Sequence, residues 1–235
     1  MRILLIAGHG DGDVGAVGNG YQEADLTREF AKLIQSHLSK YAPVDIADTS
    51  KNWYKHIISQ SNYFNFKLYD YVLEIHFNAI KKEVTSDGQT KGTEIYVTTS
   101  EKSTNVENKI LKGITNIGFK NRGIKSKNYS LIQYIKKQGV SSALLEVCFI
   151  DDIDDMKLYT SKKNEIAAAV AKGIADGFGL SVIAETPAKE QPSSWRAASF
   201  NKATAKGILD GSNPQGTVTR EMLAVVLDRL GLLDK

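Results

Sequence analysis

The sequence contains little cysteine and no long apolar run, and both shortages exclude classes of protein. A single cysteine, Cys148, rules out a disulfide framework within the chain and a metal site built on cysteines. No stretch approaches the roughly 18 apolar residues of a membrane-spanning helix, so we expect no insertion into a membrane. Because Cys148 lies in an apolar run, we expect it to be a small buried residue rather than a reactive thiol.

A secretory signal and a strong excess of one charge are lacking as well. The apolar part of MRILLIAGHG is about six residues, shorter than the roughly 7–15 of a signal core, and no cleavage site follows. We therefore expect a protein made in the cytoplasm that needs another agent to release it. The net charge of +3 does not indicate a nucleic-acid partner, which usually calls for a clustered basic face.

The sequence does contain enough apolar residues for a core, and their spacing predicts strands that alternate with helices. Hydrophobic residues make up 42% of the 235 residues. The segment YDYVLEIHFNA (69–79) has the nearly continuous apolar character of a central parallel strand that helices cover on both faces. Shorter apolar runs predict strands at 2–7, 43–47, 92–99 and 141–150, and helical spacing predicts helices at about 22–40, 52–68, 103–118 and 162–178. This alternation is typical of an α/β fold with a mostly parallel twisted sheet and helices on both faces.

The C-terminal part has a different pattern. Residues 181–194, SVIAETPAKEQPSS, lose the periodicity and contain two prolines, which indicates a linker after a domain at 1–180. Residues 195–235 predict a small α-helical module. A unit of about forty residues without cysteine seldom supplies a sufficient core of its own. We therefore expect this module to pair, either with the same module of another chain as a homo-oligomer or against 1–180.

Two of the four histidines stand at strand ends. His9 follows the first predicted strand, and His76 lies in the last turn of the central run. Ligands of open α/β sheets bind beyond the carboxyl ends of the strands, so both histidines belong to the functional edge if their strands are neighbours. Glu23 extends the inward face of the first helix towards the same edge, and the glycine-rich loop after His9 is long enough to return the chain there. His37 flanks the apolar stripe late in the first predicted helix, and His56 lies in an aromatic segment. We therefore expect both to be surface or packing histidines.

Two histidines and a carboxylate form the ligand set of many zinc hydrolases, which also need a general base. Glu146 interrupts an apolar strand, and a carboxylate there must be paired, close to a metal, or protonated. Glu74 shares one strand face with His76, because side chains alternate along a strand. Glu74 either orients a ligand histidine or pairs with a lysine.

Three stretches of the sequence resemble the zinc-dependent N-acetylmuramoyl-L-alanine amidases of cell-separation enzymes, spore autolysins and phage endolysins. They are AGHGDGDVGAVGNGYQEADLTREFAKLIQSHL, YDYVLEIHFNA and ALLEVCFIDD, and they occur in the right order over about 1–180. The segment NRGIK (121–125) is also similar to the part of that family before its last strand.

The resemblance implies both the site and the reaction. It implies that His9, Glu23 and His76 bind Zn²⁺ and that Glu146 is the catalytic glutamate. The reaction would be hydrolysis of the amide between the lactyl group of N-acetylmuramic acid and the L-alanine of the stem peptide in bacterial peptidoglycan. The metal would stabilise the oxyanion, with Arg122 as a further candidate for that role.

The module at 195–235 is similar to short C-terminal modules of Gram-positive phage lysins, so we expect it to help bind the cell wall or to mediate association. The lack of a signal peptide favours a phage or prophage endolysin that lyses a Gram-positive host, over an autolysin with its own export signal. Two alternatives stay open from the sequence. One is a zinc carboxypeptidase or another stem-peptide hydrolase, and the other is a non-catalytic protein that binds the cell wall.

Overall fold

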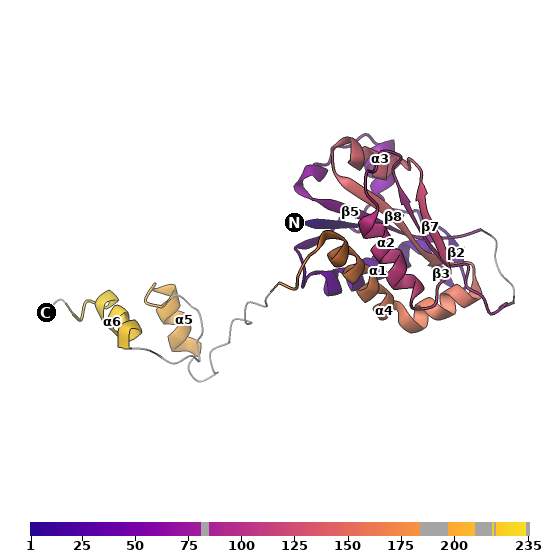
Figure 1. Ribbon diagram of the computed structural model, residues 1–235. Helices are drawn as coiled ribbons and strands as arrows, with labels where there is room; N and C mark the ends of the chain where they lie inside the picture. The colour runs from indigo at the N-terminus through magenta and orange to yellow at the C-terminus, as the bar shows by residue number, and fades with distance from the viewer. Residues whose placement is uncertain (81–84, 184–196, 210–217, 219, 234–235) are drawn as a thin grey trace. The chain divides into compact units, whose positions relative to one another are not determined.

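The computed structural model describes residues 1–80, 85–183, 197–209, 218 and 220–233 (Figure 1). The chain divides into two compact units, Met1–Ile183 and Ala184–Lys235. Among the described residues, no helix is both long enough and apolar enough to cross a membrane.

The first unit is built on a mixed sheet of six strands, in the order β4-β1-β5-β8-β6-β7. Neighbouring strands are parallel except for β8 and β6, which run antiparallel. In chain order the strands are β1 (Ile3–Ala7), β4 (Val44–Ile46), β5 (Tyr71–Asn78), β6 (Thr93–Val97), β7 (Asn121–Ser126) and β8 (Ser141–Phe149). This confirms the predicted α/β fold with a mostly parallel sheet. Two short strands, β2 (Val17–Gly18) and β3 (Tyr21–Gln22), pair separately.

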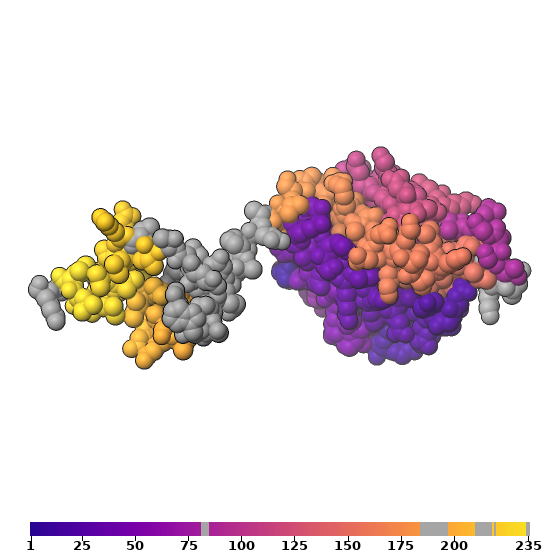
Figure 2. All heavy atoms as spheres, turned by 90° about the horizontal axis from the view of Figure 1, so that it is seen from below, coloured from indigo at the N-terminus to yellow at the C-terminus, as the bar shows by residue number. Residues whose placement is uncertain are grey.

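Three long helices cover one face of the sheet. They are α1 (Glu23–Leu38), α2 (Asn105–Thr115) and α4 (Ile153–Phe178). Figure 2 shows this face, with α4 lying between α1 and α2. Alternate strand residues such as Ile3, Leu5 and Leu73 contribute to the core beneath these helices.

The opposite face has a smaller cover. It consists of α3 (Ser130–Lys137) and two short turns, η1 (Lys55–Ser59) and η2 (Phe66–Leu68). The intervening strand residues, including Leu4, Ile6 and Val72, form a second, smaller core with them. Both faces of the strands are therefore apolar, which accounts for the nearly continuous hydrophobic runs in the sequence.

The helix predicted at 52–68 is wrong. The segment contains a π-helical turn, Lys55–Ser59, and a 3-10 turn, Phe66–Leu68, with non-helical chain between them. Its aromatic residues pack edge to face on one another instead of along a helix stripe, with ring centroids 5.0 Å apart for Trp53 and Phe64 and 4.8 Å apart for Phe64 and Phe66. Dense aromatic packing thus replaces the helical periodicity that the apolar spacing indicated.

The last helix of the first unit begins earlier than predicted. It starts at Ile153, where the side chain of Asp152 accepts a hydrogen bond from the backbone N–H of Asp155. This is an N-cap that satisfies one of the free donors of the first turn. A non-helical residue, Lys162, separates this first part from the part with the predicted periodicity. The sequence analysis also did not anticipate β7 and α3.

Among its described residues, the second unit contains two helices, α5 (Ala197–Ala205) and α6 (Arg220–Arg229), as the sequence predicts. The guanidinium of Arg229 donates hydrogen bonds of 3.0 Å to the carbonyl oxygens of Gly207 and Ile208, which follow α5. Most of the predicted linker, 181–194, lies outside the described residues. The boundaries proposed for it stay predictions.

Candidate metal centre

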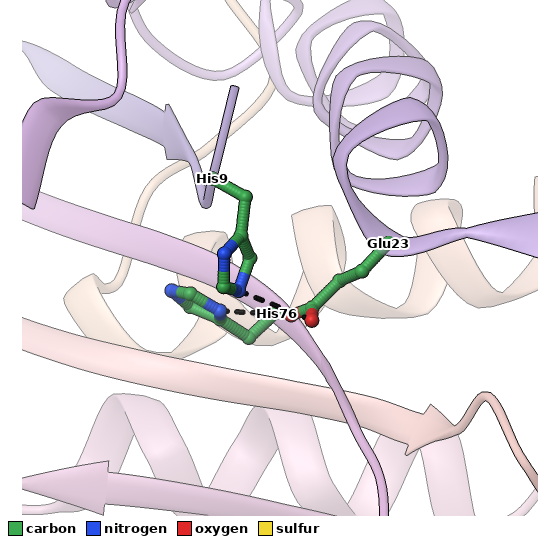
Figure 3. A group of neighbouring side chains, drawn as sticks. All are labelled: His9, Glu23 and His76. Carbon is green, nitrogen blue, oxygen red and sulfur yellow. Dashed lines mark hydrogen bonds and ion pairs between the residues drawn. The ribbon is translucent and has the colours of Figure 1, made fainter. Parts of the chain in front are cut away.

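Three side chains from separate elements meet at the carboxyl ends of β1 and β5. His9 follows β1, Glu23 is the first residue of α1, and His76 lies near the end of β5. One ligand atom from each lies within 4.8 Å of the others. The Glu23 carboxylate stands between the two imidazoles, 3.1 Å from His9 Nε2 and 2.9 Å from His76 Nδ1 (Figure 3). The structure therefore brings together the three residues that the sequence analysis selected as ligands.

The glycines of the connecting loop make room for this cluster. A Cβ atom at Gly8 would lie 2.4 Å from His76 Cε1, and one at Gly15 would lie 2.7 Å from both Glu23 Oε2 and His9 Cδ2. Gly15 also has a φ of +67°, a backbone conformation that is unfavourable for any residue with a Cβ atom. The loop is rich in glycine because rings and carboxylate pack directly against its backbone.

Arg28 of α1 holds the backbone that carries His9. Its guanidinium donates to the carbonyl oxygens of Gly8 at 3.0 Å and of His9 at 2.9 Å. His9 itself has a φ of +62°, which is uncommon for a residue with a side chain. Because strained conformations persist only where the surroundings hold them, Arg28 is part of the site. The sequence analysis missed Arg28, since its spacing in a helix does not distinguish it from a surface arginine.

The outer nitrogen of each histidine is held by a carboxylate. His9 Nδ1 lies 2.8 Å from Asp13 Oδ2, and His76 Nε2 lies 3.1 Å from Glu74 Oε1. Glu74 thus contacts a histidine, which is one of the two roles left open for it. A carboxylate on the outer nitrogen fixes the orientation of a histidine ligand and increases its basicity.

Asp13 is a residue that the sequence analysis missed. Besides His9, it accepts hydrogen bonds from the backbone N–H of Gly15 at 2.9 Å and from Asn52 Nδ2 at 3.0 Å. Its place four residues after His9 in a glycine-rich loop is a signal that could have identified it. Asn52 offers no such signal, because only the tertiary structure brings it to the loop.

The electrostatics of the cluster keep Glu23 ionised. Burial opposes its charge, but hydrogen bonds from His76 and His9 outweigh burial and hold the pKa of Glu23 well below its usual range. The backbone N–H groups of Ala16 and Phe77 also donate to it at 2.9 Å. An ionised carboxylate with a fixed orientation is what a cation requires of its ligand.

Glu146 lies beside this cluster. In the sheet register, it is opposite His76 on the neighbouring strand. Its Oε2 atom is buried and has no hydrogen-bond partner among the described residues. Burial raises the pKa of Glu146 to about 7. A carboxyl group with that pKa can take up and return a proton near neutral pH.

A cavity of about 380 Å³ opens next to the cluster, on the face of the sheet that carries α3 and η1. This volume is sufficient for a ligand of small-molecule size. Polar site residues and aromatic side chains share its lining, which includes His9, Asp13, Asn52, Trp53, Tyr54, Glu74, His76, Tyr129 and Glu146.

Comparison with known proteins agrees with this geometry. The family model for N-acetylmuramoyl-L-alanine amidase matches residues 3–176, most of the chain. The chain belongs to this amidase family. It hydrolyses the amide between N-acetylmuramic acid and L-alanine, so peptidoglycan is its class of substrate.

The matches to individual relatives cover different shares of this chain and of the relatives. The endolysin of Bacillus phage SPP1 is 30% identical over 227 residues, which are 91% of this chain and 78% of the endolysin. The amidase LytC of Bacillus subtilis is 28% identical over 73% of this chain and 34% of its own length. Among solved structures, the amidase AmiC2 of Nostoc punctiforme has a TM-score of 0.60 at 22% identity, covering 76% of this chain and 97% of its own, which shows a shared fold.

Membership of the amidase family selects among the predicted activities. It favours the amidase over the carboxypeptidase and over the non-catalytic wall-binding protein. The other two histidines lie outside the cluster, as expected. His37 Nε2 lies 3.0 Å from Asn164 Oδ1, and the ring of His56 packs edge to face on Trp53. Cys148 is fully buried.

Proposed function

We propose that the amidase binds one Zn²⁺ with His9, Glu23 and His76 and that Glu146 transfers protons in the reaction. The observation that carries the proposal is the convergence of the three donor atoms within 4.8 Å. Two imidazole nitrogens and one carboxylate fit catalytic zinc, which keeps a further position open. The carboxylates of Asp13 and Glu74 on the outer nitrogens support this assignment, because they leave His9 Nε2 and His76 Nδ1 for the metal.

In the proposed hydrolysis, Glu146 moves one proton from the attacking water to the leaving nitrogen. When bound, zinc supplies a Lewis acid that polarises the scissile carbonyl and makes water more acidic. Glu146 accepts a proton from the attacking water through its buried Oε2 atom, which has no hydrogen-bond partner among the described residues. As the carbon–nitrogen bond breaks, Glu146 returns this proton to the departing nitrogen of L-alanine. The products are a free lactyl carboxyl group and a free amino group on the peptide.

The decisive experiment combines metal removal with product analysis. Purified peptidoglycan is incubated with untreated enzyme, with chelated enzyme and with chelated enzyme after addition of Zn²⁺. We expect mass spectrometry to find free L-alanine amino groups with all peptide bonds intact, in the first and third samples only. His37→Ala is a matched control for the loss of a ligand histidine, as in His76→Ala. His37 lies on α1 outside the cluster, so its replacement should leave zinc binding unchanged. Full activity of the metal-stripped protein would contradict the zinc assignment.

We further propose that the amidase is an endolysin of a phage or prophage. The similarity to the endolysin of Bacillus phage SPP1 supports this, because it extends over 91% of the chain and thus beyond the catalytic unit. Purified protein added to intact Gram-positive cells and to isolated walls should lower the turbidity of both. If it acts on isolated muropeptides but on neither cells nor walls, an endolysin role is excluded.

The C-terminal unit would contribute by binding the wall or by joining two chains. Large apolar residues of α6 are about half exposed, among them Met222 at 57% and Leu223 at 50%. Light scattering on the full chain and on a chain ending at Leu180 would show whether residues after Leu180 mediate association. If the full chain and the shortened chain are both monomeric and lyse walls equally well, the C-terminal unit neither binds the wall nor joins two chains.

A further inference from the structure

A row of charged side chains continues from the metal cluster across the sheet. His76 on β5 is opposite Glu146 on β8, and Glu146 is opposite Glu94 on β6. Residues opposite each other on neighbouring strands project from the same face. Glu94 therefore lies on the same side of the sheet as the site, about one strand spacing of ~5 Å beyond Glu146.

Two cationic side chains lie over Glu94. Arg122 Nε is 2.6 Å from Glu94 Oε2, and Lys125 Nζ is 2.5 Å from the same oxygen. Both cations come from β7, the next strand in the sheet. The Glu94 side chain is 2% exposed, whereas those of Arg122 and Lys125 are 26% and 39% exposed. The carboxylate is buried beneath the two cations, which reach the surface.

The other contacts of Glu94 hold it in this position. Its Oε1 accepts hydrogen bonds from Asn78 Nδ2 at 2.9 Å and from the hydroxyl of Tyr96 at 2.8 Å. Burial opposes its ionisation, but hydrogen bonds from Lys125, Arg122 and Tyr96 outweigh burial and lower the pKa of Glu94. Glu94 is thus a fixed anion, and it balances only one of the two positive charges.

The guanidinium of Arg122 keeps donors for a further partner. Its Cζ atom lies over the ring of Phe149, 4.8 Å from the centroid. Apart from Nε, only Nη1 has a contact among the described residues, a long one of 3.5 Å to the carbonyl oxygen of Lys91. An arginine presents five N–H donors in a rigid fork that suits a carboxylate. The arrangement is therefore a preformed anion site with one positive charge in excess.

We propose that Arg122 and Lys125 bind a carboxylate of the stem peptide, on the residue that follows L-alanine. This rests on the proposed role of Glu146, which places the scissile amide at the neighbouring strand. An extended peptide advances ~3.3–3.6 Å per residue, so a group over β6, ~5 Å or slightly more from Glu146, falls within two residues of the cleaved bond. The sugar side of the amide carries no charge, since its lactyl carboxyl is part of the bond that is cleaved. The cations thus fix which side of the substrate lies towards β7.

The test compares two muramoyl peptides that differ in one group. Both contain the N-acetylmuramoyl-L-alanine amide, and the next residue carries either a free carboxylate or its neutral amide. The unaltered enzyme should show a lower KM for the free acid, with similar kcat for the two. Loss of one charge-assisted hydrogen bond corresponds to a change of roughly 10–100-fold, so we expect a KM difference of at least that range.

Variants assign this difference to the cations. Arg122→Gln and Lys125→Met should raise KM for the acidic substrate and leave KM for the amidated substrate nearly unchanged. Lys136→Met is the matched control, because Lys136 makes a comparable half-buried ion pair with Glu101, 2.8 Å away, outside this row. The double variant Glu94→Gln/Arg122→Gln also removes the buried carboxylate charge, and it should show the same loss of discrimination if Arg122→Gln alone fails to fold.

The outcomes separate this proposal from the proposed function. Equal KM values of the unaltered enzyme for the two substrates would overturn the carboxylate site, while metal-dependent amidase activity would stand. Equal losses on both substrates in the Arg122 and Lys125 variants would overturn it too, since they would indicate a structural role through Glu94. Activity without zinc would instead overturn the metal assignment and leave the discrimination between substrates intact.

Discussion

The two faces of the central sheet are made from the same strands but serve different ends. On one face α1, α2 and α4 cover the strands, and residues such as Leu73 and Ile75 are fully buried. On the other face the smaller cover of α3 and η1 leaves a cavity where Glu74, His76 and Glu146 lie. Along β5 the two sets alternate residue by residue. The comparison shows that the residues facing α1, α2 and α4 supply stability. The residues that alternate with them face the cavity and supply the chemistry near the strand ends.

The largest effect should come from removing a proposed zinc ligand on the open face. His76→Ala deletes one of three donors, so we expect zinc binding and amidase activity to fall below detection. The zinc content of the purified variant and its activity on peptidoglycan measure the two effects. Circular dichroism should show that the chain still folds, since the core under α1, α2 and α4 is intact. Zinc retained in full by the variant would show that His76 is not a ligand.

Replacing the proposed base should reduce activity without loss of the metal. Glu146→Gln keeps the shape of the side chain but cannot accept a proton. Positioned general bases typically contribute ~10²–10⁴-fold, and we expect kcat to fall in that range. Zinc content, measured on the same preparation, should equal that of the unaltered enzyme. If activity is fully retained, Glu74 becomes the leading candidate for the base.

A substitution on the covered face should have the opposite profile. Phe30 of α1 is fully buried and packs edge to face on Phe77 and Tyr159. Phe30→Ala removes these contacts and leaves a cavity, so the free energy of unfolding should fall by about 3–5 kcal/mol. Denaturant unfolding measures the loss, and the folded fraction should bind zinc normally. A loss of zinc binding larger than the loss of folded protein would break the division between the two faces.

The smallest effect should come from a residue that acts through a ligand. Asp13→Ala removes the carboxylate that holds His9 Nδ1, so we expect zinc affinity to fall about 10–100-fold. Competition with a chromophoric chelator gives the affinity directly. Asp11→Ala is the matched control, because Asp11 lies in the same loop, and its contact is with the exposed Lys55. Equal affinities for the two variants would exclude a positioning role for Asp13.

Local patterns were sufficient to select the four residues proposed for the site. His9 and His76 follow or end apolar strands, Glu23 extends a helix face, and Glu146 is a charge inside a buried strand. Each of these signals arises from a few adjacent residues. Arg28 and Asn52 carried no such signal, because their contacts with the His9 loop depend on how distant segments pack. The wrong helix at 52–68 has a similar origin, since contacts among its aromatic rings decide its backbone.

The sequence by itself determined most of the strands and the long helices, which of their residues are apolar on one or both faces, and which carboxylates and imidazoles are out of place in apolar surroundings. Periodicity and apolar character are properties of short segments, and a sequence shows them directly. Only the tertiary structure decided that His9 Nε2 and His76 Nδ1 face Glu23, and that Glu146 lies between His76 on one strand and Glu94 on the other. Strand order, the antiparallel direction of β6 and the register between strands result from packing across the whole sheet, which no single segment encodes.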